Sequence, residues 1–427
     1  MKKINLSNLD IFDINMVDQM QIDAPPKREQ TLFKLITDKL IKLIKTLFVP
    51  KKKSNTPIKK GSILFYGASS NNQRSFVPIY KHLVDSEYSS IKGDNEYPMV
   101  KSLYLSLPYI FHLWRIYRSG TTNERKLIKS SPLTYLFSYG KMKIAYRIMQ
   151  DYSPALLVMA NDHSPMNRCL LHAAHFFNIK TLYLQHASVT AKFPKLKFDY
   201  ALLDGQESFD KYGQTSKEIS KVLLTGATRY DDFYKTTLTT KINKIGISIN
   251  QFDDFDIVKD LCLKIREHDD LKVIVRPHPN MINWNRDWFL DNGIEYSDSS
   301  VESSNEYLNS LALQVSNVCG IHLDAAILGI PTVQFKMSKA DIEDHYKYFE
   351  IGLINKVNSY AELESLFYDQ NDLFPSASIV QYFMASSRTQ REGRVGEFTA
   401  NYIKAILMDE VHEQALEIRH NITVFKF

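Results

Sequence analysis

Residues 62–70 have the sequence Ser-Ile-Leu-Phe-Tyr-Gly-Ala-Ser-Ser, and this stretch decides the fold class. Its first five residues are mostly apolar and suit a buried strand, while the small residues from Gly67 to Ser70 suit a tight turn before a helix. A strand, a small-residue turn and a helix, in that order, form the opening unit of a doubly wound α/β domain. We therefore predict that the first domain begins here.

The same rhythm of short apolar strands and helical stretches continues along the chain and restarts once. Strands are predicted at residues 62–66, 155–160, 181–184, 200–203 and 222–224, then at 245–249, 272–275, near Ile294 and Leu313, and at 332–335. Short strands separated by helices are typical of mostly parallel sheets. We expect an α/β protein with two Rossmann-like doubly wound domains facing across a cleft, residues 61–240 and 241–427, the second carrying the C-terminal helices.

Composition narrows the class of protein. A chain of 427 residues with 44% hydrophobic residues can bury more than one core. The net charge of +5 is modest and the basic residues crowd into the first sixty positions, which argues against a nucleic-acid partner. Three widely spaced cysteines argue against a disulfide framework or a zinc site and favour the cytosol. No apolar run approaches the roughly 20 residues needed to span a bilayer.

Residues 1–60 are predicted to form a mobile arm, a basic amphipathic helix and a linker. Within residues 31–49, apolar side chains that include Leu40, Leu47 and Phe48 fall on one half of a helical wheel, and Lys34, Lys39, Lys42 and Lys45 fall on the other. Such a helix suits the surface of an anionic membrane, where lysines meet lipid headgroups and leucines enter the acyl boundary. The alternative is a helix docked on the protein's own core.

The sharpest chemical signal is Arg276-Pro277-His278-Pro279, placed directly after a predicted strand. Prolines on both sides of the histidine exclude a helix and hold the imidazole at the carboxyl end of the strand. Arginine and histidine there can donate hydrogen bonds to phosphate oxygens, which predicts a clamp for the phosphates of a nucleotide. The alternative is a rigid turn whose histidine caps a neighbouring carbonyl.

A second candidate lies in residues 316–331, where a strand runs through a small polar turn into a helix. The free amides of a helix N-terminus attract anions, so we expect a phosphate near Ser316, Asn317, Gly320 and His322, with Asp324 reaching a ribose hydroxyl. Aspartate in a first helical turn is also an ordinary stabilising choice, which leaves a purely structural reading open.

The first domain offers candidates for handling an acceptor. His186 follows the strand 181–184 and is a candidate general base, with Gln185 and Ser188 beside it. Asn161 and Asp162 follow the neighbouring strand, and Asp162 could orient His186, bind an acceptor hydroxyl or act as the base itself. Both positions also suit structural roles, namely a strand-end histidine and a helix cap. His172 and His175 have no third ligand at a useful spacing and are interpreted as structural.

In combination these motifs carry a resemblance. The order QHA (185–187), TGATRYD (225–231), RPHP (276–279) and SNVCGIHLDAAILGIP (316–331) resembles bacterial transferases of the GT-B fold that build capsules, lipopolysaccharide and teichoic acids. The most similar families are the CDP-glycerol glycerophosphotransferase-like, polysialyltransferase-like and capsular Kdo-transferase-like transferases. The resemblance implies a histidine on the acceptor side, and donor phosphates held by the histidine-proline motif, His278 and Pro279, and by the turn before the helix.

The resemblance also implies the reaction. It predicts metal-independent, cofactor-free transfer of a sugar or polyol phosphate from a CMP- or CDP-linked donor to a glycan or lipid-linked glycan, on the cytoplasmic face of the cell membrane. Arg276, His278 and the amides near Gly320 would stabilise the departing phosphate, and His186 or Asp162 would take the acceptor proton. A nucleotide-sugar 2-epimerase and a non-catalytic glycan- or membrane-binding scaffold are the alternatives.

Overall fold

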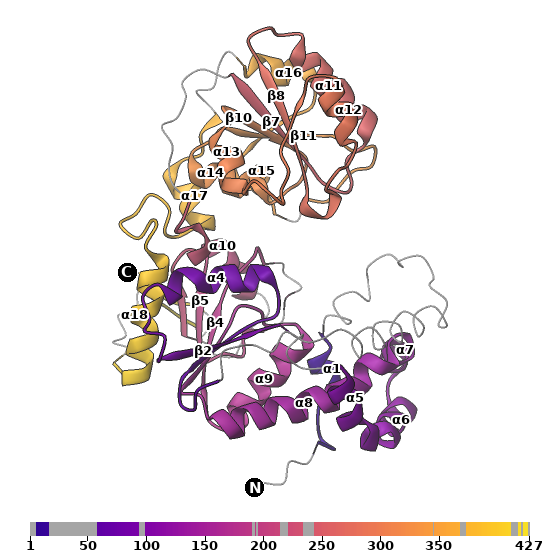
Figure 1. The fold of residues 1–427 in the computed structure, drawn as a ribbon, viewed down its shortest axis with the longest axis vertical. Helices are drawn as coiled ribbons and strands as arrows, with labels where there is room; N and C mark the ends of the chain where they lie inside the picture. Colours follow the sequence, from indigo (N-terminus) through magenta and orange to yellow (C-terminus); the bar gives the residue numbers. More distant parts are fainter. Residues whose placement is uncertain are drawn as a thin grey trace. The chain divides into compact units, whose positions relative to one another are not determined.

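The computed structural model describes residues 6–16, 58–93, 99–189, 193, 195–213, 221–233, 243–344, 346–367, 373–410, 417–419 and 422–425. The chain divides into two compact units, and each is built around its own sheet (Figure 1). Both sheets are formed mainly by parallel strands with helices between them. The prediction of two Rossmann-like α/β domains is therefore confirmed.

The sheet of unit 1 has the strand order β13-β14-β6-β5-β4-β3-β1-β2. All neighbouring strands are parallel except β13 and β14, which are antiparallel to each other. Sequence periodicity predicted β1, β3, β4, β5 and β6 but not the other three. The strands are β1 (Ile63–Gly67), β2 (Tyr88–Lys92), β3 (Leu156–Met159), β4 (Lys180–Leu184), β5 (Tyr200–Leu203), β6 (Lys221–Leu224), β13 (Glu417–Arg419) and β14 (Ile422–Phe425).

Helices bury the central strands of this sheet, and β1 and β3 have no exposed residue. One core cluster joins strand residues such as Phe65 and Val158 to Phe76 of α4 and to Ile403 of α18. The helical segments here are α1 (Ile11–Ile14), α4 (Ser70–Tyr80), α5 (Met99–Ser106), η2 (Leu107–Tyr109), α6 (Ile110–Ser119), α7 (Thr122–Ser130), α8 (Pro132–Tyr152), α9 (Pro165–Phe176), α10 (Gln206–Gly213) and α18 (Val395–Met408). The long helices predicted before β3 correspond to α5, α6 and α8.

Unit 2 contains a six-stranded parallel sheet with the order β12-β11-β10-β7-β8-β9. Its strands are β7 (Lys244–Ile249), β8 (Lys272–Pro277), β9 (Glu295–Tyr296), β10 (Leu313–Ser316), β11 (Thr332–Phe335) and β12 (Asn355–Val357). Its helices are η3 (Thr228–Tyr230), α11 (Phe255–Arg266), η4 (Pro279–Met281), α12 (Arg286–Asp291), α13 (Ser304–Asn309), α14 (Ile321–Leu328), α15 (Tyr348–Ile351), α16 (Tyr360–Ser365) and α17 (Ala377–Phe383). Separate apolar clusters cover the two faces of this sheet.

The boundaries between the units correct the predicted division of the chain. Unit 2 consists of Asp204–Ser208, which includes the first residues of α10, and Thr225–Val395, so it begins before the predicted boundary at 240. From Gly396 the chain belongs to unit 1, whereas all C-terminal helices were expected in the second domain. The physical reason is the packing of α18, whose Ala400, Ile403 and Ile406 are fully buried in the core of unit 1.

The beginning of the chain is also more ordered than predicted. Residues 6–16 were expected to belong to a mobile arm, but they contain α1, which Asp10 caps by accepting hydrogen bonds from the amides of Phe12 and Asp13. Ile11 and Ile14 are buried. Asp13 forms an ion pair with the buried Arg168 of α9, at 2.5 and 2.6 Å from Nη2 to its two carboxylate oxygens. This charge pair fastens α1 to unit 1.

The predicted amphipathic helix at 31–49, with Lys34, Lys39, Lys42, Lys45, Leu40, Leu47 and Phe48, lies outside the described residues. None of the helices in the described part of the chain combines the length and the hydrophobicity that crossing a bilayer would require.

The ion pair gives a first testable prediction. Asp13→Asn leaves the Arg168 guanidinium buried without its anionic partner, and loss of one member of such a pair costs about 3 kcal/mol. We expect amide hydrogen exchange in peptides covering residues 6–16 to accelerate on the order of 100-fold. Asp10→Asn is the matched control, because asparagine still caps a helix and the same charge is removed three residues away. Equal exchange in Asp13→Asn and wild type would contradict the role of this pair.

Candidate functional site

The strand order of unit 2 places its candidate site. From β7 the chain adds β8 and β9 on one side and β10, β11 and β12 on the other, so the order reverses between β7 and β10. The loops that leave the carboxyl ends of two such strands run in opposite directions, and ligands of doubly wound domains bind there. The loops concerned begin at Asn250 after β7 and at Asn317 after β10, and His278 follows the adjacent strand β8. The sequence-predicted donor residues therefore lie at one edge of one sheet.

His278 is held in a fixed orientation by its own turn. Its amide donates to the carbonyl of Ile249 at 2.8 Å, and its Nδ1 accepts from the amide of Asn280 at 3.2 Å. Pro279 forms the first residue of η4, where its missing N–H is of no consequence. Because Nδ1 accepts a hydrogen bond, the proton of the neutral imidazole lies on Nε2. The exposed ring of His278 therefore presents an Nε2–H donor.

Arg276 makes different contacts from those predicted. Its guanidinium is buried and donates from Nη1 to Ser297 Oγ at 2.5 Å and from Nη2 to the carbonyl of Glu302 at 3.0 Å. It also lies over the ring of Tyr307, 5.2 Å from the centroid. Burial lowers its pKa. These contacts use the guanidinium to fasten residues 297–302, which favours a structural role over direct contact with a phosphate.

The loops after β7 and β10 are joined by buried hydrogen bonds. The side-chain Nδ2 of Asn317 donates to Asp253 Oδ1 at 3.0 Å and to Ser338 Oγ at 3.1 Å, while Asp253 Oδ2 accepts from the backbone amide of Asn250 at 2.7 Å. Ser316 donates to the carbonyl of Ser248 at 2.8 Å. Burial raises the pKa of Asp253. Ser316 and Asn317 therefore fix the shape of the edge, and Asp253 is part of the same network.

His322 is a structural residue in this arrangement. It is fully buried, with Nδ1 2.6 Å from Thr332 Oγ1 and Nε2 2.9 Å from the carbonyl oxygen of Asn317. Burial lowers its pKa to about 4, so the imidazole is neutral at pH 7. Its predicted place beside a phosphate is corrected, because both ring nitrogens already have partners inside the protein.

The first turn of α14 connects to a segment expected in the other domain. Asp324 accepts a hydrogen bond from Tyr230 OH at 2.5 Å, and burial raises the pKa of Asp324. Tyr230 belongs to the segment 225–231, whose Arg229 pairs with Asp204 at 2.7 Å. Asp324 therefore anchors this segment to α14 instead of extending toward a ribose. No side chain caps α14, and a Cβ at its N-cap residue Gly320 would meet only Tyr346, at 3.7 Å.

The sheet of unit 1 has a reversal of its own, between β1 and β3. The loop after β3 holds Asn161, Asp162 and His163, and Asn161 Oδ1 accepts from the amides of His163 and Ser164 at 3.0 and 2.8 Å. Asp162 is buried, and its Oδ1 lies 2.9 Å from His163 Nδ1. Side chains thus fold this loop into one compact turn at the edge where a ligand of unit 1 would bind.

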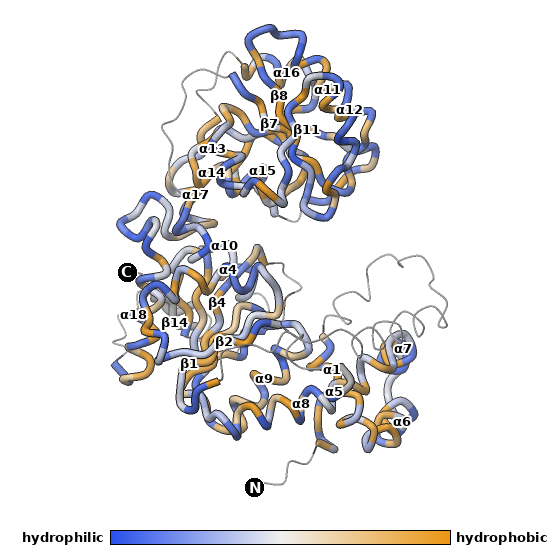
Figure 2. The backbone as a smooth tube through the Cα atoms, viewed as in Figure 1, coloured by the Kyte–Doolittle hydropathy of each residue, from blue (hydrophilic) through white to orange (hydrophobic). Residues whose placement is uncertain are grey.

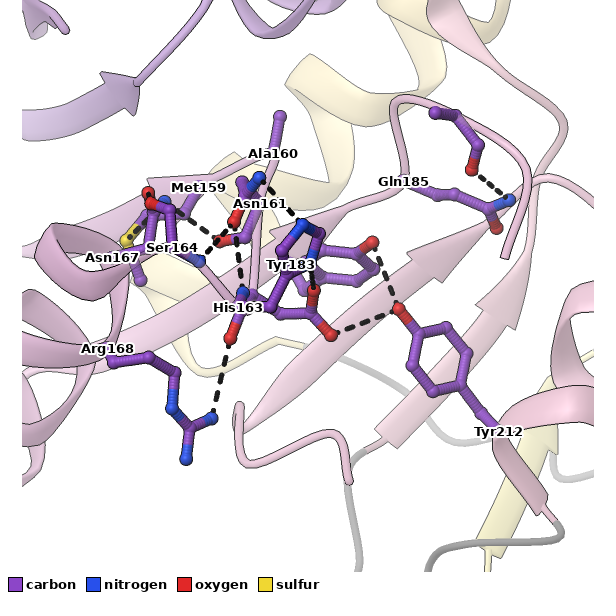
Figure 3. A network of polar contacts seen from close by, with 12 residues as sticks. Met159, Ala160, Asn161, His163, Ser164, Asn167, Arg168, Tyr183, Gln185 and Tyr212 are labelled. Atoms are coloured by element: carbon purple, nitrogen blue, oxygen red, sulfur yellow. Dashed lines mark hydrogen bonds and ion pairs between the residues drawn. The ribbon is translucent and has the colours of Figure 1, made fainter. Parts of the chain in front are cut away.

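Tyr212 completes this network, as Figure 3 shows. Its hydroxyl lies 3.1 Å from Asp162 Oδ2 and 3.1 Å from the hydroxyl of Tyr183 on β4. Burial and the adjacent Asp162 carboxylate raise the pKa of Tyr212 well above its usual value, so it remains a protonated donor. Both oxygens of Asp162 are therefore occupied by side chains of the protein, with His163 as the half-buried member of the group.

His186 lies half-buried after β4, two residues before the half-buried Ser188. Gln185 is buried, and its side-chain amide donates to the carbonyl of Ala187 at 3.0 Å, which shapes this turn. Asp162 contacts His163 and Tyr212, so the prediction that it orients His186 gains no support. His163 is the residue that sequence reasoning missed, although it stands next to Asp162 in the chain.

Among the residues that the structure describes, no group of three or more His, Cys, Asp and Glu side chains is placed to hold a metal ion. His172 and His175 are exposed on α9. Partial desolvation of each imidazole lowers its pKa.

Comparison of the sequence with protein-family models and with curated proteins gives no match. Among solved structures, similar chains include the glycosyltransferase SnogD from Streptomyces nogalater, with 12% identity, coverage of 82% of this chain and 99% of that one, and a TM-score of 0.48. UDP-GlcNAc 2-epimerase from Neisseria meningitidis, bound to UDP-GlcNAc, has 11% identity, coverage of 81% and 100%, and a TM-score of 0.46. The wall teichoic acid polymerase TagF has 11% identity, coverage of 88% and 98%, and a TM-score of 0.46. Assignment of the fold rests on the strand order of the chain itself.

The buried imidazole of His322 gives a second prediction. In the folded protein it should stay neutral at pH 6 and take up a proton only as the pH approaches about 4, which imidazole ¹⁵N chemical shifts would report. An unfolded histidine has a pKa near 6.5 and binds a proton earlier. The free energy of unfolding should therefore fall as the pH drops from about 6.5 toward 4, and His322→Asn should remove this component. A His322 imidazolium at pH 6 would contradict the burial described here.

Proposed function

We propose that this protein is an enzyme that transfers a sugar, or a polyol phosphate, from a nucleotide-activated donor bound by unit 2. The observation that carries the proposal is His278, an exposed imidazole fixed at the carboxyl end of β8 beside the reversal of the strand order. Nucleotide phosphates bind at this place in doubly wound domains. The order of motifs that resembles bacterial GT-B transferases supports the same class of reaction.

In this proposal His278 donates from Nε2 to an oxygen of the departing phosphate. The N-terminal amides of α14 lie at the same edge, and a helix N-terminus carries about half a positive charge. Negative charge grows on the phosphate as the bond to the transferred group breaks, so donors fixed in advance lower the barrier. We propose a CMP- or CDP-linked donor on the resemblance alone. The hydrogen bonds from His278 and from the amides of α14 would stabilise the phosphate without a metal ion. Metal independence is therefore part of the proposal.

The acceptor hydroxyl must lose its proton, and we propose that the group built on Asp162 accepts it. The Asp162 carboxylate has both oxygens occupied, so it acts through His163 by holding the proton of that ring on Nδ1. The lone pair then lies on His163 Nε2, whose contact with Asn161 Nδ2 is long at 3.5 Å, and the acceptor hydroxyl can replace that contact and give up its proton there. His186 is the alternative base, and the acceptor is a glycan or lipid-linked glycan at the inner membrane face.

A nucleotide-binding assay tests the donor site and is the third prediction. Thermal shifts with CMP, CDP, UDP and GDP should show stabilisation by a pyrimidine nucleotide. Both His278→Ala and His278→Asn should remove most of the shift, because neither retains the Nε2–H donor. His278→Asn separates ligand binding from turn formation, since its side-chain oxygen can still accept from the amide of Asn280. An undiminished shift in His278→Asn, with the wild-type melting temperature, would exclude the phosphate contact.

Turnover of the matching activated donor gives the fourth prediction. Asp162→Asn and His163→Gln should each lower kcat by roughly 10²–10⁴-fold with little change in the nucleotide-induced thermal shift, since the base acts only in the chemical step. His186→Gln is the matched comparison on the adjacent strand. A large loss in His186→Gln, with full activity in His163→Gln, would assign the proton to His186. Turnover of the free nucleotide sugar without any acceptor would instead indicate an epimerase.

A further inference from the structure

The helices α5 and α6 of unit 1 expose an unusual set of large apolar side chains. Phe111 is 83% exposed, Tyr104 73% and Trp114 55%. We call the following residues the aromatic-basic face: Tyr104, Leu107, Ile110, Phe111, Trp114, Arg115, Tyr117 and Arg118, all of them exposed. Single exposed apolar residues are ordinary on protein surfaces, but a contiguous group marks an interaction site.

Helical spacing gathers these residues on one side of α6. At 100° per residue, Ile110, Phe111, Trp114 and Tyr117 span about 120° of the helix circumference, whereas Leu113 points elsewhere and is buried. Figure 2 shows hydrophobic residues, in orange, along α6. A helix that serves only a protein core buries its apolar stripe and exposes a polar one. α6 instead presents apolar residues to the solvent as well as to the protein.

The support beneath the face is rigid. Ser106 Oγ accepts from the amide of Gly140 at 2.8 Å and donates to the carbonyl of Ser102 at 2.7 Å, which ties α5 to α8. A Cβ at Gly140 would lie 1.9 Å from the carbonyl oxygen of Ser102, so only glycine permits this approach. Tyr109 stacks on Tyr139 with ring centroids 4.6 Å apart. The exposed aromatic rings are therefore not needed for the packing that holds these helices together.

The charge around the face has one sign. Residues 99–130 contain six lysines and arginines (Lys101, Arg115, Arg118, Arg125, Lys126 and Lys129) but a single acid, Glu124. Glu124 is engaged in capping α7, where it accepts from the amide of Thr121 at 2.6 Å. The guanidinium of Arg118 lies over the Trp114 ring, 5.0 Å from its centroid, so charge and aromatic surface occupy the same place. The partner must therefore offer negative charge together with an apolar interior.

We propose that the aromatic-basic face docks unit 1 onto the surface of an anionic lipid bilayer. Tryptophan and tyrosine favour the headgroup level, phenylalanine and isoleucine enter the acyl boundary, and arginines pair with lipid phosphates. This commits to a membrane and not to a second copy of the chain or a protein partner. The face consists of other residues than the predicted helix at 31–49, and the proposal does not depend on the proposed reaction, because binding can be measured without turnover.

Sedimentation of the full-length protein with vesicles tests the proposal and is the fifth prediction. Wild type should partition onto vesicles of equal phosphatidylglycerol and phosphatidylcholine at 0.1 M NaCl, and much less onto pure phosphatidylcholine or at 0.5 M NaCl. Phe111→Ser combined with Trp114→Ser should lower the partition coefficient at least about tenfold. Arg115→Ala combined with Arg118→Ala should lower it about tenfold on the anionic vesicles alone.

Tryptophan fluorescence is a second measurement of the same binding. Brominated lipids should quench the tryptophan fluorescence of the wild type, and this quenching should be lost in Trp114→Phe.

Matched controls lie in unit 2. Phe349→Ser removes an equally large exposed ring, and Lys336→Ala with Lys339→Ala removes two exposed positive charges, so both should bind as wild type does. The wild-type melting temperature in every variant establishes that folding is intact. Undiminished binding by Phe111→Ser with Trp114→Ser would overturn the proposal. So would wild-type self-association that the same substitutions abolish, without vesicle binding, because a second copy would then cover the face.

Discussion

The structure depends on one constraint, namely that parallel strands bring all of their carboxyl ends to the same edge of a sheet. In each unit the chain extends the sheet first on one side of its opening strand and then on the other, so the order reverses at β1 and β3 and again at β7 and β10. Two neighbouring loops at that edge leave in opposite directions and cannot fill the space between them. Residues far apart in the sequence, such as Asn250, His278 and Asn317, are gathered at this edge for that reason.

Most polar groups at the edge of unit 2 are used to build the edge itself. Asn317 and Asp253 hold two loops together, Arg276 holds the segment after β9, and His322 joins Thr332 to the carbonyl of Asn317. Buried polar groups need such partners, because leaving one without a partner costs about 1–3 kcal/mol. The result is a stiff frame that surrounds an exposed imidazole, and stiffness is what an electrostatic site requires. Most residues that were predicted to bind the donor therefore hold the loops of this edge together instead.

Sequence reasoning succeeded where a local pattern determines the structure. The buried strands Leu156–Met159 and Tyr200–Leu203 are mostly apolar runs and were predicted within a residue or two. The strand Tyr88–Lys92 contains serines and a lysine, and Asn355–Val357 is three residues long, so neither carries a clear period. The return of α18 to unit 1 and the contact of Tyr212 with Asp162 depend on tertiary packing between distant segments, which no local pattern encodes. α1 was missed because one buried turn is too short to show a period.

The environment of Asp162 decides how the loop after β3 can act. A carboxyl group that is 1% exposed has lost its hydration, and its two oxygens have partners inside the protein instead: Tyr212 donates to one and His163 lies against the other. The high pKa of Tyr212 prevents it from giving up that proton, so this contact is permanent over the physiological range. An acceptor hydroxyl therefore cannot reach the carboxylate without breaking a buried bond. The same carboxyl group holds the imidazole beside it in one orientation and one tautomer, because His163 Nδ1 lies 2.9 Å from Asp162 Oδ1. The pair is thus better suited to proton transfer than either residue would be alone.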